Sequence, residues 1–146
     1  MTAIFDKLGI RFSYPDNWTL DESEALEGNR AVSVYSPEGA FWAVVAHEPD
    51  VSPEELAATA LATMRGQYDE LDAEQAEESV AGRQLIGYDM NFYCLDLTNT
   101  AIVRSFRASD AVFVVFCQAE DREFVDVEPI FRALTRSLVD STSPPD

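Results

Sequence analysis

The fold is decided by residues 84–118, which read QLIGYDMNFYCLDLTNTAIVRSFRASDAVFVVFCQ. Most of this stretch is apolar, and two short polar connectors, Thr98-Asn99 and Ser109-Asp110, divide it. Connectors of this length are typical of β-hairpins, in which neighbouring strands are antiparallel. The stretch therefore predicts three consecutive antiparallel strands, over residues 84–96, 100–107 and 111–118.

The third of these strands carries apolar side chains on both sides of the sheet. Side chains alternate along a strand, which places Val112, Val114 and Phe116 on one side and Phe113, Val115 and Cys117 on the other. A strand of this kind must be covered on both sides. We therefore expect an α+β protein, built as a three-layer α/β/α sandwich around a mainly antiparallel sheet.

The chain before residue 84 predicts further strands and one helix. Alternating or apolar runs predict strands over residues 9–14, 18–21, 31–35 and 40–47. Ser52 is expected to cap a helix, because Pro53 suits the first helical position and Glu55 completes a capping box. Residues 69–78 contain six carboxylates and no base, which indicates a solvated acidic loop or an edge strand.

A closing helix is expected from about Phe124 to Val139, where apolar residues recur at helical spacing. Pro129 is expected in its first turn, because a proline further inside would break the helix. No repeat or linker interrupts the sequence, so we expect a single domain over residues 1–140. Residues 141–146 have no apolar anchor and are expected to form a flexible C-terminal tail.

The composition narrows the classes of function. The 146 residues include 27 Asp and Glu but only 10 Lys and Arg, which gives a net charge of −17. Such a surface repels phosphates, so we expect no nucleic-acid partner and no insertion into a membrane. The sequence shows no signal peptide, lipidation cysteine or membrane span, and we expect a cytoplasmic protein. Cys94 and Cys117 are expected to be reduced and buried.

The sequence carries no recognisable catalytic signature. His47 is the only histidine, and no G-x-S-x-G motif is present. Three interpretations of His47 stay open: a structural histidine, a metal ligand together with a distant carboxylate, and a catalytic base. We expect no cofactor and no metal.

Polar side chains interrupt the apolar pattern of two predicted strands. Asp89, Asn91 and Tyr93 share one side of their strand. If Thr98-Asn99 is a two-residue turn, Tyr93 lies opposite Arg104, and Asn91 lies opposite Phe106. The resulting polar strip has three interpretations: an internal ion-pair network beneath a helix, a groove that grips a partner segment, or a paired-carboxylate active site.

Two segments carry a resemblance to a known family. Residues 9–18 read GIRFSYPDNW and resemble the opening strand of the PsbP-like and DcrB-like proteins, in which a Tyr-Pro-x-x-Trp turn is typical. The segment from Phe124 to Leu138, with Pro129, Phe131, Leu134 and Ser137, is similar to the closing helix of that family. The family includes photosystem subunits, a factor that binds the Ran GTPase, envelope lipoproteins, and chaperones associated with type VI secretion effectors. The resemblance implies the fold of this family and a role without catalysis.

The leading hypothesis is a non-enzymatic protein-binding module, a chaperone or adaptor that holds a partner segment on its sheet or in a groove. Its expected partner-binding residues are Asp89, Asn91, Tyr93, Arg104 and Phe106. The alternative is a small-molecule-binding protein or enzyme that uses Asp89, Arg104 or His47. A homodimer built on an exposed sheet face is a further option.

Overall fold

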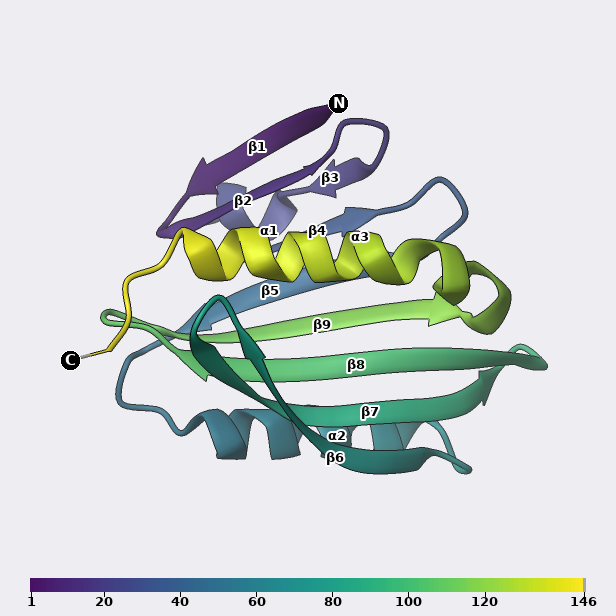
Figure 1. Ribbon diagram of the computed structural model, residues 1–146. Helices are drawn as coiled ribbons and strands as arrows, with labels where there is room; N and C mark the ends of the chain where they lie inside the picture. The colour runs from purple at the N-terminus through teal and green to yellow at the C-terminus, as the bar shows by residue number, and fades with distance from the viewer. Residues whose placement is uncertain (146) are drawn as a thin grey trace.

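A computed structural model describes residues 1–145 of the chain. Its strands are β1 (Thr2–Lys7), β2 (Ile10–Pro15), β3 (Thr19–Asp21), β4 (Ala31–Tyr35), β5 (Phe41–His47), β6 (Asp72–Val80), β7 (Arg83–Cys94), β8 (Leu97–Arg107) and β9 (Val112–Glu120). Its helices are α1 (Ser23–Leu26), α2 (Pro53–Gln67) and α3 (Asp121–Asp140). Seven strands form one antiparallel sheet in the order β3-β4-β5-β9-β8-β7-β6 (Figure 1), and β1 pairs with β2 in a separate hairpin.

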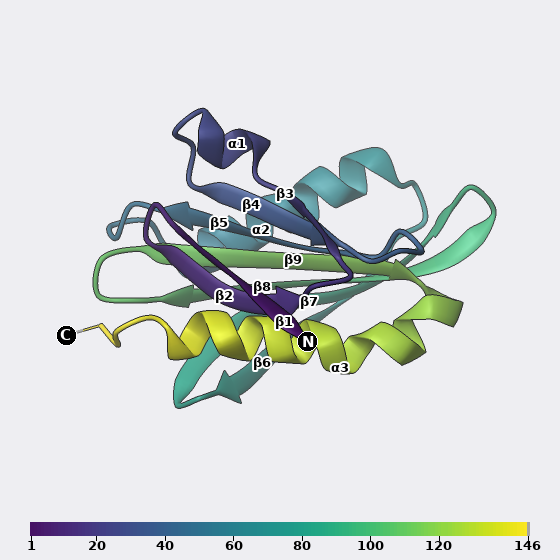
Figure 2. The same cartoon turned by 90° about the horizontal axis from the view of Figure 1, so that it is seen from above.

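The sheet is covered on both faces, as its apolar pattern predicts. Helix α3 and the β1–β2 hairpin lie on one face, and α2 lies on the other (Figure 2). The α3 face packs around Trp42, Phe113 and Leu134, whereas the α2 face packs around Met64 and Phe92. The expected α+β class and three-layer α/β/α sandwich are therefore confirmed.

The start of α2 follows from local sequence. Ser52 lies at the N-cap, where its hydroxyl accepts a hydrogen bond from the backbone N–H of Glu55 at 3.2 Å, and Pro53 is the first helical residue. A hydroxyl here satisfies one of the backbone donors that a helix start leaves free. This part of the sequence prediction is confirmed.

The turn between β7 and β8 differs from the prediction. Leu95 and Asp96 form the turn, with φ angles of 53° and 63°, so Tyr93 pairs with Thr98 instead of Arg104. A two-residue turn with both φ angles positive usually contains Asn-Gly or Asp-Gly. Leu95-Asp96 gives no such signal, and the polar pair Thr98-Asn99 lies within β8 instead.

Helix α3 also differs from the prediction, because it begins at Asp121 and keeps Pro129 in its interior. An interior proline removes one backbone hydrogen bond and crowds the preceding turn. Burial offsets this cost, since one face of α3 lies in the core through Val127, Phe131, Leu134 and Leu138. The expectation that Pro129 lies in the first turn is wrong.

The end of the described chain lies against the domain. Arg83 donates hydrogen bonds from its guanidinium to the hydroxyl of Thr142 at 2.9 Å and to its carbonyl at 2.7 Å. The backbone N–H of Ser109 donates to the carbonyl of Ser143 at 3.0 Å. A domain over residues 1–140 with a flexible tail stays a prediction. Within residues 1–145, no helix combines the length and hydropathy that a membrane crossing requires.

Candidate functional site

A groove runs between α3 and the outer strands of the sheet. It consists of two adjoining hollows, with volumes of about 410 and 600 Å³, which share Asp89, Ile102 and Glu128 in their walls. Strand β8 supplies the floor, β6 and β7 supply one wall, and α3 supplies the other. We call this feature the α3 groove.

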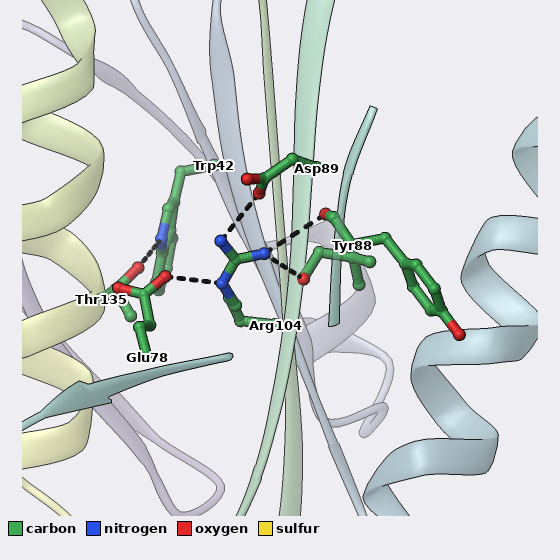
Figure 3. Close-up of polar contacts among 7 residues, drawn as sticks. Trp42, Glu78, Tyr88, Asp89, Arg104 and Thr135 are labelled. Carbon is green, nitrogen blue, oxygen red and sulfur yellow. Dashed lines mark hydrogen bonds and ion pairs between the residues drawn. The ribbon is translucent and has the colours of Figure 1, made fainter. Parts of the chain in front are cut away.

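Arg104 lies in the floor of the α3 groove and is only 7% exposed. Its Nε donates to Oε2 of Glu78 at 2.6 Å, and its Nη2 donates to Oδ1 of Asp89 at 2.7 Å (Figure 3). Its Nη1 donates to the carbonyl oxygens of Val103 and Tyr88, at 3.0 and 3.3 Å. The guanidinium therefore connects β8 with both strands of the adjoining wall.

The electrostatics of Arg104 follow from these contacts. Burial alone lowers the pKa of the guanidinium, but the hydrogen bonds that it donates to Glu78 and Asp89 outweigh burial, so the pKa is raised above its ordinary value. The arginine stays charged, and its charge is neutralised by two carboxylates that are themselves half exposed. The arrangement fixes the floor of the groove and leaves the guanidinium without capacity for proton transfer.

Gly87 allows the backbones of β7 and β8 to approach closely beside Arg104. The two residues lie directly opposite each other on β7 and β8. A Cβ atom on Gly87 would lie 1.9 Å from the carbonyl oxygen of Val103 and 3.2 Å from the Cα of Arg104. Only glycine fits at this position, because no rearrangement of a side chain relieves a contact with the backbone.

A second polar contact ties the sheet to α3 beside the groove. The indole Nε1 of Trp42 donates to the hydroxyl of Thr135 at 3.0 Å, as Figure 3 shows. Trp42 is fully buried, so without this bond its indole N–H would have no hydrogen-bond acceptor. The α3 wall therefore has a fixed distance from the sheet.

The larger hollow is acidic. Four carboxylates line it, those of Asp72, Glu74, Asp89 and Glu128. Among the described residues 1–145, no basic side chain lines this hollow. Glu74 lies directly opposite Asp89, and Asp72 lies directly opposite Asn91. Half-buried Ile102 and Phe124 add apolar surface beside these carboxylates.

No protein-family model and no curated protein matches this sequence. Solved structures do match the fold over nearly its whole length. The yeast Ran-binding protein Mog1p, from Saccharomyces cerevisiae, has a TM-score of 0.62 at 13% identity, over 100% of this chain and 96% of its own. CyanoP, the cyanobacterial PsbP of Synechocystis, has a TM-score of 0.62 at 12% identity, over 93% of this chain and 90% of its own.

A Pseudomonas aeruginosa protein of unknown function also matches, with a TM-score of 0.59 at 12% identity, over 94% of this chain and 95% of its own. The chain has the PsbP/Mog1-like fold. Identities this low concern the fold alone. The fold expected from the Tyr-Pro-x-x-Trp turn and the closing helix is thereby confirmed.

Within this PsbP/Mog1-like fold, the structure brings together three of the five residues that the sequence singles out. Asp89, Asn91 and Arg104 line the α3 groove. Tyr93 is 61% exposed near the β7–β8 turn, and Phe106 is 1% exposed, with its ring stacked on Phe113 at 5.3 Å. Phe106 therefore supports the groove from the core.

The polar strip persists although the predicted register is wrong. Asn91 lies opposite Thr100, and its amide donates to the Thr100 hydroxyl at 3.0 Å. Because the register differs by six residues, an even number, every side chain keeps its predicted face. Asp89 and Arg104 consequently meet as diagonal neighbours, which long side chains can bridge.

Sequence reasoning missed the groove residues Glu74, Glu78 and Glu128. Of the acidic run at residues 69–78, the part from Asp72 onward lies in the edge strand β6, and alternation along that strand would have placed Glu74 and Glu78 on one side. The facing position of Glu128 depends on how α3 packs over the sheet, which no local pattern predicts.

The other candidate residues lie elsewhere. His47 ends β5 on the α2 side of the sheet, opposite Val112, whereas Asp89 faces α3. Within residues 1–145, no three His, Cys, Asp or Glu side chains are grouped as a metal site. Cys117 is buried on the α3 side, and burial raises the pKa of its thiol to about 12. Cys94 belongs to the α2 side, where the hydroxyl of Tyr68 donates to its Sγ at 4.0 Å.

Proposed function

We propose that the chain is a non-enzymatic protein-binding module that holds a segment of a partner protein in the α3 groove. The observation that carries this proposal is the Arg104 network, which makes the groove floor rigid while it neutralises the charges that could perform chemistry. A rigid, partly apolar groove loses little conformational freedom when a segment binds, which favours affinity.

The dimensions of the groove support the same function. Its two hollows adjoin along α3, so the groove is elongated, as an extended peptide segment requires. Its apolar lining includes Ile102, Val115 and Phe131, and charged side chains of both signs surround it, among them Glu78, Glu128, Arg132 and Arg136. An apolar floor within a polar rim is the usual anatomy of a recognition site.

The structural likeness supports protein binding in a general way. Mog1p is by its name a Ran-binding protein, and CyanoP is a PsbP protein. For this chain we propose a chaperone or adaptor of the cytoplasm, in which Asp89, Asn91 and Arg104 face the partner. Tyr93 lies beyond the groove and is proposed to contact the partner's flanking residues.

The alternative is a small-molecule-binding protein or enzyme, and the positions of its expected residues favour it less than protein binding. His47 and Asp89 lie on opposite faces of the sheet, and Asp89 and Arg104 are bonded to each other. A homodimer built on an exposed sheet face stays a prediction, and light scattering on the purified chain checks it.

Site-specific photocrosslinking tests the proposal. A photoreactive amino acid replaces Asn91, which is exposed in the groove, and in a matched control it replaces Ala62, which is exposed on α2. In the cells that produce the protein, we expect position 91 to capture one defined partner that position 62 does not capture. The same adducts from both positions, or none from position 91, would contradict the proposal.

A further inference from the structure

The acidic hollow of the α3 groove contains an unfavourable pair of like charges. Glu74 and Asp89 are direct cross-strand neighbours on the α3 side of β6 and β7. Side chains in such positions have Cβ atoms only about 5 Å apart, and two carboxylates there repel each other. Asp72 lies on the same side of β6, two residues before Glu74, and Glu128 lines the hollow from α3.

The neighbouring arginines relieve this repulsion only in part. Arg104 reaches Oδ1 of Asp89 and is shared with Glu78, so it does not contact Glu74. Arg132 lies 3.3 Å from Glu128, but its side chain is largely exposed and a pair of that kind is weak. The hollow therefore keeps an excess of negative charge in a chain whose net charge is already −17.

The shape of the hollow fits the side chain of lysine or arginine. Ile102 and Phe124 are half buried next to the carboxylates and offer an apolar surface. Lys and Arg lay their methylene groups along such a surface while their charged ends reach polar groups. Glu74 lines the hollow from β6 and Glu128 lines it from α3, so a cation bound there can be contacted from two walls.

We propose that the acidic hollow binds a Lys or Arg side chain of the partner segment, with apolar residues of the same segment over Ile102 and Phe124. This inference rests on the proposed function and specifies the partner as a basic, partly apolar segment. The net negative charge of the chain accelerates its association with such a segment, and salt screens this attraction.

Peptide binding to the 146-residue chain tests this inference. The probes are a fluorescent peptide of alternating Lys and Leu, the same peptide with Gln in place of Lys, and free spermine as competitor. We expect the Gln peptide to bind roughly tenfold more weakly than the Lys peptide, with the difference reduced at high salt. Equal affinities of the two peptides, no binding of either, or displacement of the Lys peptide by micromolar spermine would overturn the inference.

Matched variants link the binding to the acidic hollow. Glu74→Gln is expected to weaken the Lys peptide about two- to fivefold, whereas Glu27→Gln, the same change at an exposed position in α1's C-cap, leaves affinity unchanged. Equal effects of the two variants would attribute binding to net charge and overturn the inference. If the Gln peptide binds as well as the Lys peptide and Ile102→Glu abolishes both, the groove still holds a segment and only the basic specificity is lost.

Thermal unfolding supplies an independent check on the same variant. Because Glu74→Gln removes a like-charge contact with Asp89, it is expected to raise the Tm by about 1–3 °C while it weakens binding. A more stable protein that binds less well is the signature of a residue kept for its partner. A lower Tm together with weaker binding would indicate a structural role for Glu74 and overturn the inference.

Discussion

At the scale of single residues, Arg104 and Gly87 form one arrangement. The guanidinium of Arg104 bonds to carboxylates on β6 and β7, and Gly87 leaves the space for the strands to approach. The groove floor depends on both residues, since Arg104 supplies the hydrogen bonds and Gly87 permits the close approach of β7 to β8.

Replacement of Arg104 by Met is expected to lower the free energy of unfolding by about 1–3 kcal/mol. The variant leaves Glu78, Asp89 and two carbonyl oxygens without their donor, but both carboxylates are half exposed, so water replaces part of the loss. Urea unfolding measures the change. Arg104→Lys keeps the positive charge but loses the planar set of guanidinium donors, so its free energy of unfolding should lie between those of the wild type and the Met variant. A Met variant as stable as the wild type would contradict this account.

Replacement of Gly87 by Ala is expected to destabilise the protein by about 2–4 kcal/mol, because the added methyl group meets backbone atoms of β8. Gly66 offers the matched control, since it lies inside α2 with open space around it. Gly66→Ala should stabilise the protein by about 0.5–1 kcal/mol through helix propensity. Equal effects of the two substitutions in thermal unfolding would refute the steric role of Gly87.

Cys117 predicts a dependence of stability on alkaline pH. The pKa of its thiol is about 12 in the folded chain, against an ordinary value of 9.0. Because the folded pKa is the higher one, this contribution to stability is complete below pH 9 and is lost progressively as the pH rises toward 12. Urea unfolding of the wild type and of Cys117→Ala across this pH range isolates the contribution of the thiol. Parallel curves of stability against pH for the two proteins would exclude that contribution.

At the scale of elements, the β7–β8 hairpin has an unusual turn. Leu95 and Asp96 both have positive φ angles, and the side chain of Leu95 is 92% exposed. The other two tight hairpin turns, at Leu8-Gly9 and Ala81-Gly82, place glycine at their second position. The β7–β8 turn is therefore the one that carries strain at both residues.

Substitution of Leu95-Asp96 by Asn-Gly is expected to stabilise the protein by about 1–2 kcal/mol, since these residues adopt the required conformation at low cost. Differential scanning calorimetry measures the effect. Asn-Gly at the Ala81-Gly82 turn, where glycine already occupies the second position, serves as the control and should change stability less. A loss of stability at positions 95 and 96 would show that Leu95 contributes more by contact than it costs by strain.

Local patterns predicted most elements, and long-range packing determined the rest. The cap at Ser52 and the two-sided apolar pattern of β9 are local, so α2 and the three layers could be predicted. Pairing of β7 with β8 holds Leu95 and Asp96 at positive φ angles, although these residue types disfavour that conformation. Pro129 is tolerated inside α3 because one face of the helix is buried. The groove residues Asp89, Asn91 and Arg104 could be predicted because a register change by an even number of residues leaves each side chain on the same face of the sheet.

At the scale of the whole molecule, two surfaces compete for the role of binding site. One is the α3 groove. The other is a row of aromatic rings on the α2 side, where Tyr35, Phe41 and Phe116 follow one another at centroid distances of 5.7 and 5.8 Å. Helix α2 packs on β7, β8 and β9, so the part of this row on β4 and β5, which holds Tyr35 and Phe41, is only partly covered. The acidic carboxylates and the elongated shape favour the groove.

Chemical-shift mapping separates the two surfaces most directly. The isotope-labelled 146-residue chain is titrated with the segment of the partner that crosslinks to position 91. We expect the backbone amides of β6, β7 and α3 around Glu74, Asp89 and Glu128 to shift. Shifts confined to Tyr35, Phe41 and Phe116, with the groove amides unchanged, would contradict the α3 groove as the binding site.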